Sequence, residues 1–400
     1  MKPDMQVILL GVDSPIGLSV IRELAGHGVD VHGLAWSRAG IGLYSRHLKR
    51  GLIRARDEDA LISQLNALAG ETGCRWLMTV SENDILMLHR RRADLHHLTP
   101  LIPPLAAFHR VLDKAETFAV ARKLGIRTPH TWQITHSSDI NALAANLRFP
   151  VVLKWANPQA VRAPLASIGQ TLDKYRYLHD LDELQRYLTP LDAISQYPLI
   201  QEYCPGQGLG QMLYLHEGKP LLRFQHLRLR EYPPEGGVSA VCAATTIDEQ
   251  RMAGSIALLN ALEWEGPAMV EYRYDPQSDS VCLMEINGRF WGSQPLALHS
   301  GAHFAWFMFS VGALGTVPDQ ITIRTDLQAR FFIPELRRLL RVLFRNSLIQ
   351  DRSKRFNRFA ELARFLIDYL DPRSRYYVFS VRDPLPFFAD LWFSLTQRFR

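Results

Sequence analysis

The distribution of apolar and polar positions predicts alternating strands and helices in the first hundred residues. The apolar run 7–10 and the segment 30–35 are predicted as strands, and the segment between them is expected to be helical to about His27. A further strand is expected from Trp76 to Val80. These elements predict an amino-terminal α/β domain of the Rossmann-like β-α-β type.

A turn with glycines at both ends, Gly11 and Gly17, joins the first strand to the first helix. Such a turn can hold a phosphate at the helix amino terminus. The spacing differs from the dinucleotide fingerprint G-x-G-x-x-G, and the second strand is followed by Ala35-Trp36-Ser37-Arg38, which contains no acid. An NAD-dependent oxidoreductase is therefore disfavoured.

Two further strands are predicted at 269–274 and 281–284, with the turn signal Asp275-Pro276 between them. The second strand continues into Glu285-Ile286-Asn287-Gly288-Arg289-Phe290. Successive side chains of a strand point to opposite faces, so Glu285, Asn287 and Arg289 are expected on one face. The hairpin is also expected to bring Glu271 beside Glu285.

This face has the chemistry of a metal and phosphate site. Mg²⁺ prefers hard oxygen ligands, commonly one or two carboxylates plus phosphate oxygens, and an arginine fork can hold a phosphate. The alternative is an exposed polar face. Strongly apolar neighbours on both sides favour a buried strand, in which charges are retained when they are paired or bound to metal.

Four segments follow one another along the chain. They are Asp113-Lys114 at the start of a helix that ends in Gly125-Ile126-Arg127-Thr128-Pro129, the strand 149–155 with Lys154, the strand 199–206, and Glu271 with 285–289. In this order they resemble the ATP-grasp superfamily, and within it the carboxylate-amine ligases and the related carbamoyl-phosphate synthase and biotin carboxylase domains. The resemblance covers about residues 105 to 315, and it implies that 199–206 is the hinge strand.

The resemblance implies an α/β and α+β architecture: an N-terminal pre-ATP-grasp domain at 1–104, a two-subdomain ATP-grasp core at 105–323 with its small subdomain at about 125–203, and a basic helical C-terminal extension at 324–400. It implies ATP with Mg²⁺, or Mn²⁺ in its place. The implied nucleotide-binding residues are Lys114, Lys154, Gln201, Glu202, Tyr203 and Cys204, the metal ligands are Glu271, Glu285 and Asn287, and Arg289 steadies the transferring phosphoryl group.

Lys154 is the stronger of the two lysine candidates, because a lone charge in an apolar strand needs a partner, whereas Lys114 can be a solvated residue at a helix start. Two features depart from the family. Residues 156–176 contain one glycine, Gly169, where many such enzymes have a glycine-rich loop. The positions 205–208 after the hinge contain no acid, so ribose recognition is unassigned.

Two segments are candidates for the acceptor side. Arg228 and Arg230 precede the loop 233–239, whose glycine pair allows close backbone approach to a ligand. Arg230 is the preferred catalytic candidate of the two, and a charged surface hairpin is the alternative. The segment 81–84 either reaches the acceptor or caps a helix with Ser81.

Composition adds a basic tail to this picture. A chain of 400 residues with 47% hydrophobic content is expected to form two or three domains. No signal peptide is recognised, the longest apolar stretch (304–314) is too short to span a bilayer, and the four cysteines have no metal-type spacing. A cytoplasmic protein is expected. Residues 324–400 contain 16 Lys plus Arg and 8 Asp plus Glu, a balance of +8, against −2 for the first 323 residues.

Two apolar stripes occur in this tail, one beside arginines in 335–349 and one formed by Phe387, Phe388, Leu391, Trp392, Leu395 and Phe399. Such helices either lie on an anionic membrane or pack on the core with solvated arginines. Nucleic acid is not expected as a partner, since no known reader motif is present.

The sequence therefore predicts an ATP-dependent ligase that joins a small-molecule carboxylate to an amine through an acyl phosphate. The alternative is a catalytically degenerate, ATP-binding, membrane-peripheral scaffold or sensor. The substrates and the oligomeric state stay open.

Overall fold

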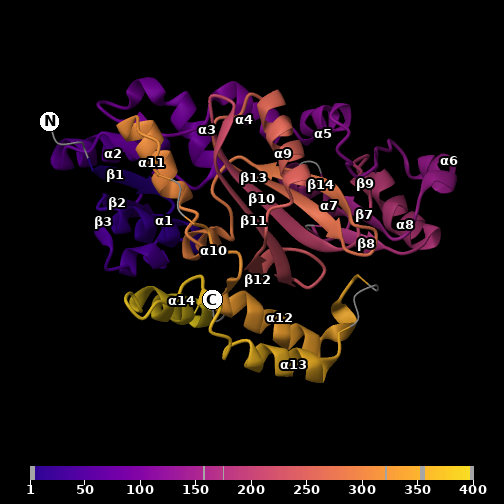
Figure 1. Cartoon of the computed structure of the whole chain (residues 1–400). Helices are drawn as coiled ribbons and strands as arrows, with labels where there is room; N and C mark the ends of the chain where they lie inside the picture. The colour runs from indigo at the N-terminus through magenta and orange to yellow at the C-terminus, as the bar shows by residue number, and fades with distance from the viewer. Residues whose placement is uncertain (1–4, 156–157, 174, 320–321, 352–355, 397–400) are drawn as a thin grey trace.

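The structure is a computed structural model that describes residues 5–155, 158–173, 175–319, 322–351 and 356–396 (Figure 1). It contains three β-sheets with helices packed around them. In Figure 1 the amino-terminal sheet lies at the left, the large central sheet in the middle and the small sheet at the right, while the carboxy-terminal helices follow the lower edge. The predicted mixture of α/β and α+β parts is confirmed.

The amino-terminal sheet is parallel, with the order β3-β2-β1-β4-β5. Its strands are β1 (Gln6–Leu10), β2 (Asp30–Ala35), β3 (Leu48–Ile53), β4 (Trp76–Thr79) and β5 (Thr99–Pro100), and its helices include α1 (Pro15–Gly26), α2 (Glu58–Thr72) and α3 (Glu82–Arg90). Apolar residues of β1 are buried on both faces, as expected for a parallel sheet covered by helices. The predicted Rossmann-like arrangement is thus confirmed.

The small sheet is antiparallel, with the order β6-β9-β7-β8. Its strands are β6 (Thr131–Trp132), β7 (Val151–Lys154), β8 (Arg176–Leu178) and β9 (Leu199–Glu202), with helices α6 (Ile140–Leu143), α7 (Pro158–Ser167) and α8 (Leu181–Leu188). Because side chains alternate along a strand, the two faces of β7 lie in different surroundings. Val151 and Leu153 belong to the apolar cluster of this sheet, whereas Val152 and Lys154 line a cavity on the other face.

The central sheet has the order β14-β13-β10-β11-β12-β15-β16. Its strands are β10 (Gln207–His216), β11 (Lys219–Tyr232), β12 (Val238–Ala244), β13 (Gly266–Asp275), β14 (Ser280–Asn287), β15 (Gln328–Arg330) and β16 (Ser374–Tyr376). The helices of this region are α4 (Leu105–Leu112), α5 (Lys114–Lys123), α9 (Glu249–Ala261), α10 (Gln294–His299) and α11 (Phe304–Leu314).

The segment expected as a helical extension does more than add helices. It contains α12 (Phe332–Phe344), α13 (Arg358–Ile367) and α14 (Leu385–Thr396), and its β15 and β16 also join the edge of the central sheet. β15 pairs with β12 through Val241 and Arg330. The carboxy-terminal part is therefore hydrogen-bonded into the main body. Among the described residues, no helix is both long enough and apolar enough to cross a membrane.

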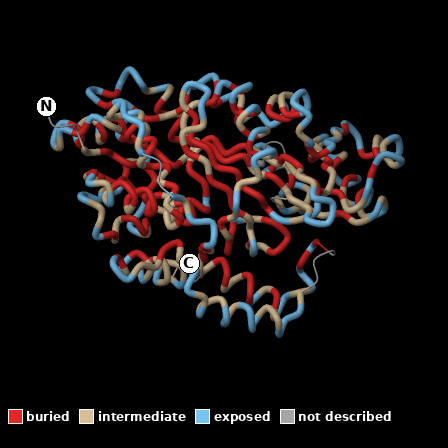
Figure 2. Tube along the Cα trace, in the orientation of Figure 1, coloured by how far each residue is buried: buried red, intermediate tan, exposed pale blue. Residues whose placement is uncertain are grey.

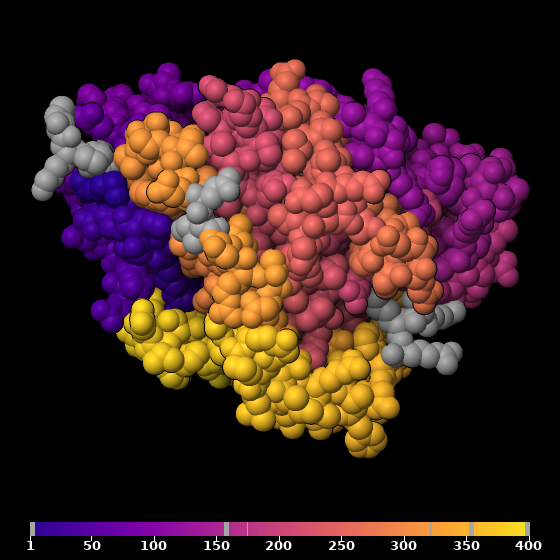
Figure 3. Space-filling view, viewed as in Figure 1, coloured from indigo at the N-terminus to yellow at the C-terminus, as the bar shows by residue number. Residues whose placement is uncertain are grey.

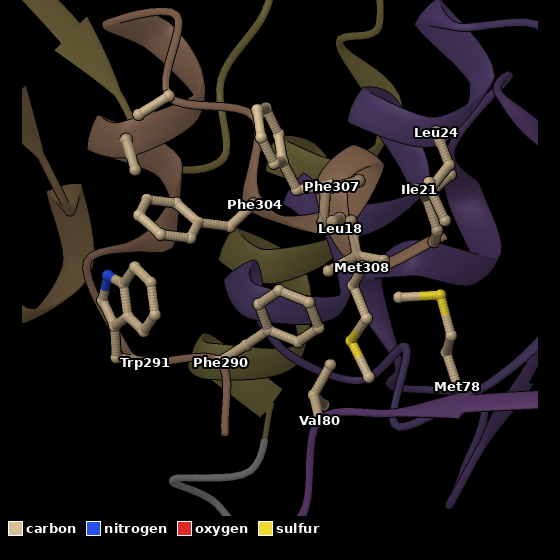
Figure 4. Packing of buried hydrophobic residues seen from close by; sticks show 14 of the residues in the cluster. Leu18, Ile21, Leu24, Met78, Val80, Phe290, Trp291, Phe304, Phe307 and Met308 are labelled. Carbon is tan, nitrogen blue, oxygen red and sulfur yellow. The ribbon is translucent and has the colours of Figure 1, made fainter. Parts of the chain in front are cut away.

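The largest apolar core joins the amino-terminal sheet to the central sheet (Figure 4). Leu18 and Ile21 of α1 pack in one cluster with Phe304 and Met308 of α11. Phe290, which directly follows the Glu-x-Asn-x-Arg segment, belongs to the same cluster. Full burial of such a side chain contributes about 1.5–3 kcal/mol. The buried residues form continuous bands through the sheets (Figure 2), so this core fixes the end of β14 relative to α1.

Candidate functional site

A cavity of about 570 Å³ lies between the central sheet, the small sheet and the start of α1. All but one of the residues predicted for the site line it: Lys114, Lys154, Gln201, Glu202, Tyr203, Cys204, Glu271, Glu285, Asn287 and Arg289. The four segments that carry these residues are separated in sequence by up to about 170 positions. Folding nevertheless places them around one space.

The two carboxylates are positioned by a hairpin. Glu271 of β13 and Glu285 of β14 are directly opposite each other in the antiparallel register, as the sequence predicted. The turn that sets this register is organised by Asp275, whose carboxylate accepts hydrogen bonds from the backbone N–H of Gln277 (3.0 Å) and the hydroxyl of Ser278 (2.8 Å). Asn287 lies two residues beyond Glu285, and both side chains face the cavity.

Each carboxylate has its own cationic partner. Arg228 of β11 donates a hydrogen bond to Glu271, and the Nζ of Lys114 lies 2.9 Å from Oε2 of Glu285. Burial, with the neighbouring charge of Glu285, raises the pKa of Glu271 despite Arg228. Burial acts in the same direction on Glu285, but the ammonium of Lys114 outweighs it and lowers the pKa of that carboxyl. The two acids are therefore held in different environments.

Lys154 is the last residue of β7 and points into the cavity. Its Nζ donates a hydrogen bond of 2.7 Å to Oε1 of Gln201 in the neighbouring strand β9. Burial, reinforced by the charge of Lys114, lowers the pKa of Lys154 to about 8. The lysine thus has a neutral partner, so its charge is available to an anionic ligand.

The hinge strand β9 and the residues after it form one wall. Glu202 accepts a hydrogen bond of 2.6 Å from Arg127, and the hydroxyl of Tyr203 donates one of 2.9 Å to Asp351. The Sγ atoms of Cys204 and Cys282 are 3.0 Å apart, and both cysteines are buried free thiols. The sequence, in which these cysteines are 78 positions apart, did not predict this contact.

Arg289 follows β14 and reaches helix α3 of the amino-terminal part. Its Nε lies 3.0 Å from Oε1 of Glu82 at the start of α3. Ser81 is the N-cap residue of that helix but makes no side-chain cap hydrogen bond, while Asp84 is bound by the buried Arg54 at 2.9 Å. Of the two alternatives for the segment 81–84, the cap position is observed, and Glu82 additionally contacts a cavity residue.

Arg230, predicted as a catalytic residue, lies outside the cavity. It donates hydrogen bonds to Glu335 (2.5 Å) and Asp368 (2.7 Å), and it is not among the described residues that line the cavity. Residues i and i+2 of a regular strand share a face, but the pairing of β11 with β12 is irregular between Arg228 and Arg230 and again after Arg230. Arg228 consequently faces the cavity, whereas Arg230 faces α12.

Several cavity residues were missed from sequence. Arg273 of β13 pairs with Glu231 at 3.1 Å, and Tyr177 of β8 donates a hydrogen bond of 2.8 Å to the carbonyl of Glu235. Tyr175 donates in the same way to the carbonyl of Gly236. The one available signal was the position of Arg273, two residues after Glu271 in the same strand. The two tyrosines hold the loop 233–237 over the cavity.

No family model and no curated protein matches the chain. Solved structures do. The biotin carboxylase domain of the 2-oxoglutarate carboxylase from Hydrogenobacter thermophilus, in complex with MgADP, ADP and bicarbonate, is similar at 16% identity, with a TM-score of 0.59 over 82% of this chain and 74% of that one. The chain has the ATP-grasp fold.

Two other proteins share this ATP-grasp fold with the chain. N5-carboxyaminoimidazole ribonucleotide synthetase from Thermus thermophilus is 15% identical, with a TM-score of 0.57 over 80% of this chain and 81% of that one. L-amino acid ligase from Bacillus licheniformis is 16% identical, with a TM-score of 0.53 over 78% and 75%. At these identities the similarity establishes the fold.

The donor set of the cavity fits a divalent ion bound together with phosphate. Among the described residues there is no group of three or more His, Cys, Asp or Glu side chains that could enclose a metal by themselves. Glu271, Glu285 and Asn287 instead offer two carboxylates and one amide, which suits Mg²⁺ that completes its shell with phosphate oxygens and water. Lys114, Lys154 and Arg289 supply the cations that a polyphosphate requires.

Proposed function

We propose that the chain is an ATP-dependent ligase that joins a carboxylate to an amine through an acyl phosphate and releases ADP and phosphate. The observation that carries the proposal is the pair of opposed carboxylates, Glu271 and Glu285, in one cavity with the partly buried Lys154. The ATP-grasp fold supports it, since the biotin carboxylase neighbour is described with MgADP.

In this proposal Lys114 and Lys154 bind the nucleotide phosphates, and the backbone of residues 201–204 contacts the adenine. Glu271, Glu285 and Asn287 would hold Mg²⁺, or Mn²⁺ in its place, which offsets phosphate charge when bound. Arg289 stabilises charge on the transferring phosphoryl group. Catalysis by positioning and charge stabilisation requires no covalent enzyme intermediate.

The substrate carboxylate attacks the γ-phosphorus of ATP, and ADP leaves. The amine then attacks the carbonyl carbon of the acyl phosphate and displaces phosphate, which yields the amide. Ser14, Arg228 and Gly237 line the part of the cavity that we assign to these two substrates. We assign residues 1–104 to the substrate-side domain, 105–323 to the ATP-grasp core and 324–400 to the carboxy-terminal part.

The alternative of a membrane-peripheral scaffold or sensor without turnover is not favoured. A scaffold needs neither a pair of carboxylates suited to metal nor a cation suited to a transferring phosphoryl group, and Glu271, Glu285 and Arg289 line one cavity. Four buried free cysteines suit a reducing, cytoplasmic compartment, which we propose as the site of action.

The test is release of ADP and phosphate from MgATP by the purified chain, screened against pools of carboxylic acids and amines. We expect release that depends on both a carboxylate and an amine and is lost in Glu285→Gln. Tight MgATP binding with no turnover on any pool, equal in wild type and Glu285→Gln, would instead support the scaffold.

A further inference from the structure

Exposed apolar side chains are concentrated in the carboxy-terminal helices. Of the twenty large apolar side chains that are exposed among the described residues, thirteen lie between Leu340 and Leu395. α13 contains no buried residue at all. Soluble monomers rarely expose large contiguous apolar patches, so a concentration of this kind marks an interaction surface.

The exposed residues of α14 follow helical spacing. Leu385, Phe388, Trp392 and Leu395 are three or four positions apart, and each is 58–65% exposed. Side chains at this spacing lie on one helical face. Ala389, by contrast, is buried. α14 therefore packs one apolar side against the protein and presents a second apolar side to the surroundings.

The neighbouring helices repeat this arrangement. On α13 and directly after it, Phe359 (85% exposed), Leu362, Leu366 and Leu370 (83%) are again three or four positions apart. α12 has Leu340 and Phe344 exposed while Val342 is buried. Figures 1 and 3 show the three helices together along one edge of the molecule, and α12 contacts α13. Three apolar stripes thus belong to one layer.

The charge of this layer identifies its partner class. α12, α13 and α14 contain five arginines and three acids, and the sequence of residues 324–400 as a whole has a balance of +8. Arg345, Arg358 and Arg364 are exposed beside the stripes. An apolar surface with an excess of arginine is complementary to a surface that is both apolar and anionic.

A groove on this layer combines the two properties. It has a volume of about 560 Å³ and is lined by Arg337, Arg341, Arg345, Leu340, Phe344 and Tyr232, among others. Arg337 and Arg341 are four positions apart on one face of α12, and Arg345 is the residue directly after the helix. Cationic and apolar walls at one site match an anionic lipid headgroup with the start of its acyl chain.

We propose that α12, α13 and α14 form a docking surface for membranes that contain anionic phospholipid. The sequence left two alternatives for the tail, packing on the core or contact with a membrane. Leu339 and Val342 of α12 are buried against the protein, while the stripes are exposed and available for the proposed membrane contact. Phe399, the last residue of the predicted second stripe, lies outside the described residues.

The docking surface adjoins the cavity. Tyr232 lines the groove, and the loop that follows it contributes Glu235 and Gly236 to the cavity. Arg341 donates a hydrogen bond of 2.7 Å to Glu235, which connects groove and loop directly. Membrane binding by this surface does not require the ligase activity.

The test is co-sedimentation of the full chain with vesicles of phosphatidylcholine alone and of phosphatidylcholine mixed with phosphatidylglycerol. We expect pelleting with the anionic vesicles, and loss of pelleting at high salt, because salt screens exposed charges. Phe388→Ser/Trp392→Ser/Leu395→Ser is expected to lower the partition coefficient at least about tenfold, since it removes three apolar contacts. Arg345→Glu/Arg358→Glu/Arg364→Glu is expected to do the same.

The matched control is Ile53→Ser/Leu124→Ser/Val317→Ser, which removes three exposed apolar side chains elsewhere and is expected to bind vesicles like wild type. Thermal unfolding confirms that each variant is folded. Absence of pelleting on anionic vesicles would overturn the proposal. Sedimentation velocity tests the other occupant, a second copy of the chain. The proposal would also be overturned if the wild type self-associated, if Phe388→Ser/Trp392→Ser/Leu395→Ser abolished this self-association, and if neither protein bound vesicles.

Discussion

Lys114 and Glu285 form an ion pair of 2.9 Å that joins the first residue of α5 to β14. The pair is 58% and 38% exposed, so its own contribution to stability is about 1 kcal/mol at most. Asp113, the N-cap of α5, fixes the start of the helix by accepting hydrogen bonds from the N–H groups of Ala115 and Glu116. A weak pair on fixed supports can separate, and in the proposed function this would free the ammonium for phosphate and the carboxylate for metal.

The first prediction concerns Glu285→Gln. It removes the charge of a proposed metal ligand but keeps the shape of the side chain, so we expect ADP release to be lost while the free energy of unfolding changes by less than about 1 kcal/mol. Glu71→Gln is the control, because it breaks an exposed ion pair with Arg50 (2.5 Å) far from the cavity. Turnover that survives in Glu285→Gln would reject the metal assignment.

The second prediction concerns Lys154 and pH. Because burial lowers its pKa to about 8 from the ordinary 10.5, the folded chain binds fewer protons than the unfolded chain between these pH values. Lys154 therefore disfavours folding at neutral pH, and the free energy of unfolding rises with pH through this window. Lys154→Met should lack this rise, which urea denaturation at several pH values would show.

Nucleotide binding should depend on pH in the opposite sense. The ammonium form binds phosphate, so the affinity of wild type for MgATP should be about tenfold weaker at pH 9 than at pH 7. In Lys154→Met the affinity at pH 7 should be about 10- to 100-fold weaker, and this pH dependence should disappear. Isothermal titration calorimetry measures both. An unchanged pH dependence in the variant would exclude Lys154 as its source.

The sequence predicted local features well, because they depend on neighbours in the chain. The hairpin of β13 and β14 follows from two strand patterns and one turn signal, and its register pairs Glu271 with Glu285 as expected. The position of Lys154 follows from strand alternation within β7. Both depend on interactions within about twenty residues.

Features that depend on long-range packing were not predictable. The irregular pairing of β11 with β12 turns Arg228 and Arg230 to different faces of the sheet, and no residue pattern in the sequence predicts this irregularity. The contact of Cys204 with Cys282 and the hydrogen bond from Tyr177 to the loop at Glu235 join segments more than fifty residues apart. Such contacts require the small sheet to be placed on the central sheet, which a single sequence does not specify.

The third prediction concerns the mostly buried pair of Arg228 and Glu271, whose side chains are 13% and 15% exposed. Arg228→Met leaves Glu271 buried without its main cation, so we expect a loss of about 3–5 kcal/mol in the free energy of unfolding. The double variant Arg228→Met/Glu271→Leu should recover much of this loss, since no unpaired acid then remains at that position. Arg223→Met on the same strand is the control: its pair with Glu249 is exposed, and about 1 kcal/mol or less should be lost. Additive losses in the double variant would contradict the pairing.

The fourth prediction separates Arg230 from Arg289. Arg230 joins β11 to Glu335 and Asp368, while Glu335 keeps the second partner Arg330 at 2.6 Å. Arg230→Met should therefore lower the free energy of unfolding by about 2 kcal/mol. Its kcat for ADP release, measured where the variant is folded, should stay within about twofold of wild type, because losing a buried ion pair outside the cavity acts on stability.

Arg289→Met should behave in the opposite way. Its guanidinium lines the cavity, so removal should lower kcat by about 100-fold or more while stability changes little. Its pair with Glu82 is partly exposed, which limits the loss in the free energy of unfolding to about 1 kcal/mol. If folded Arg230→Met lost activity as severely as Arg289→Met, the guanidinium of Arg230 would have to reach the cavity in the working enzyme, and the packing of β11 against α12 would have to change during turnover.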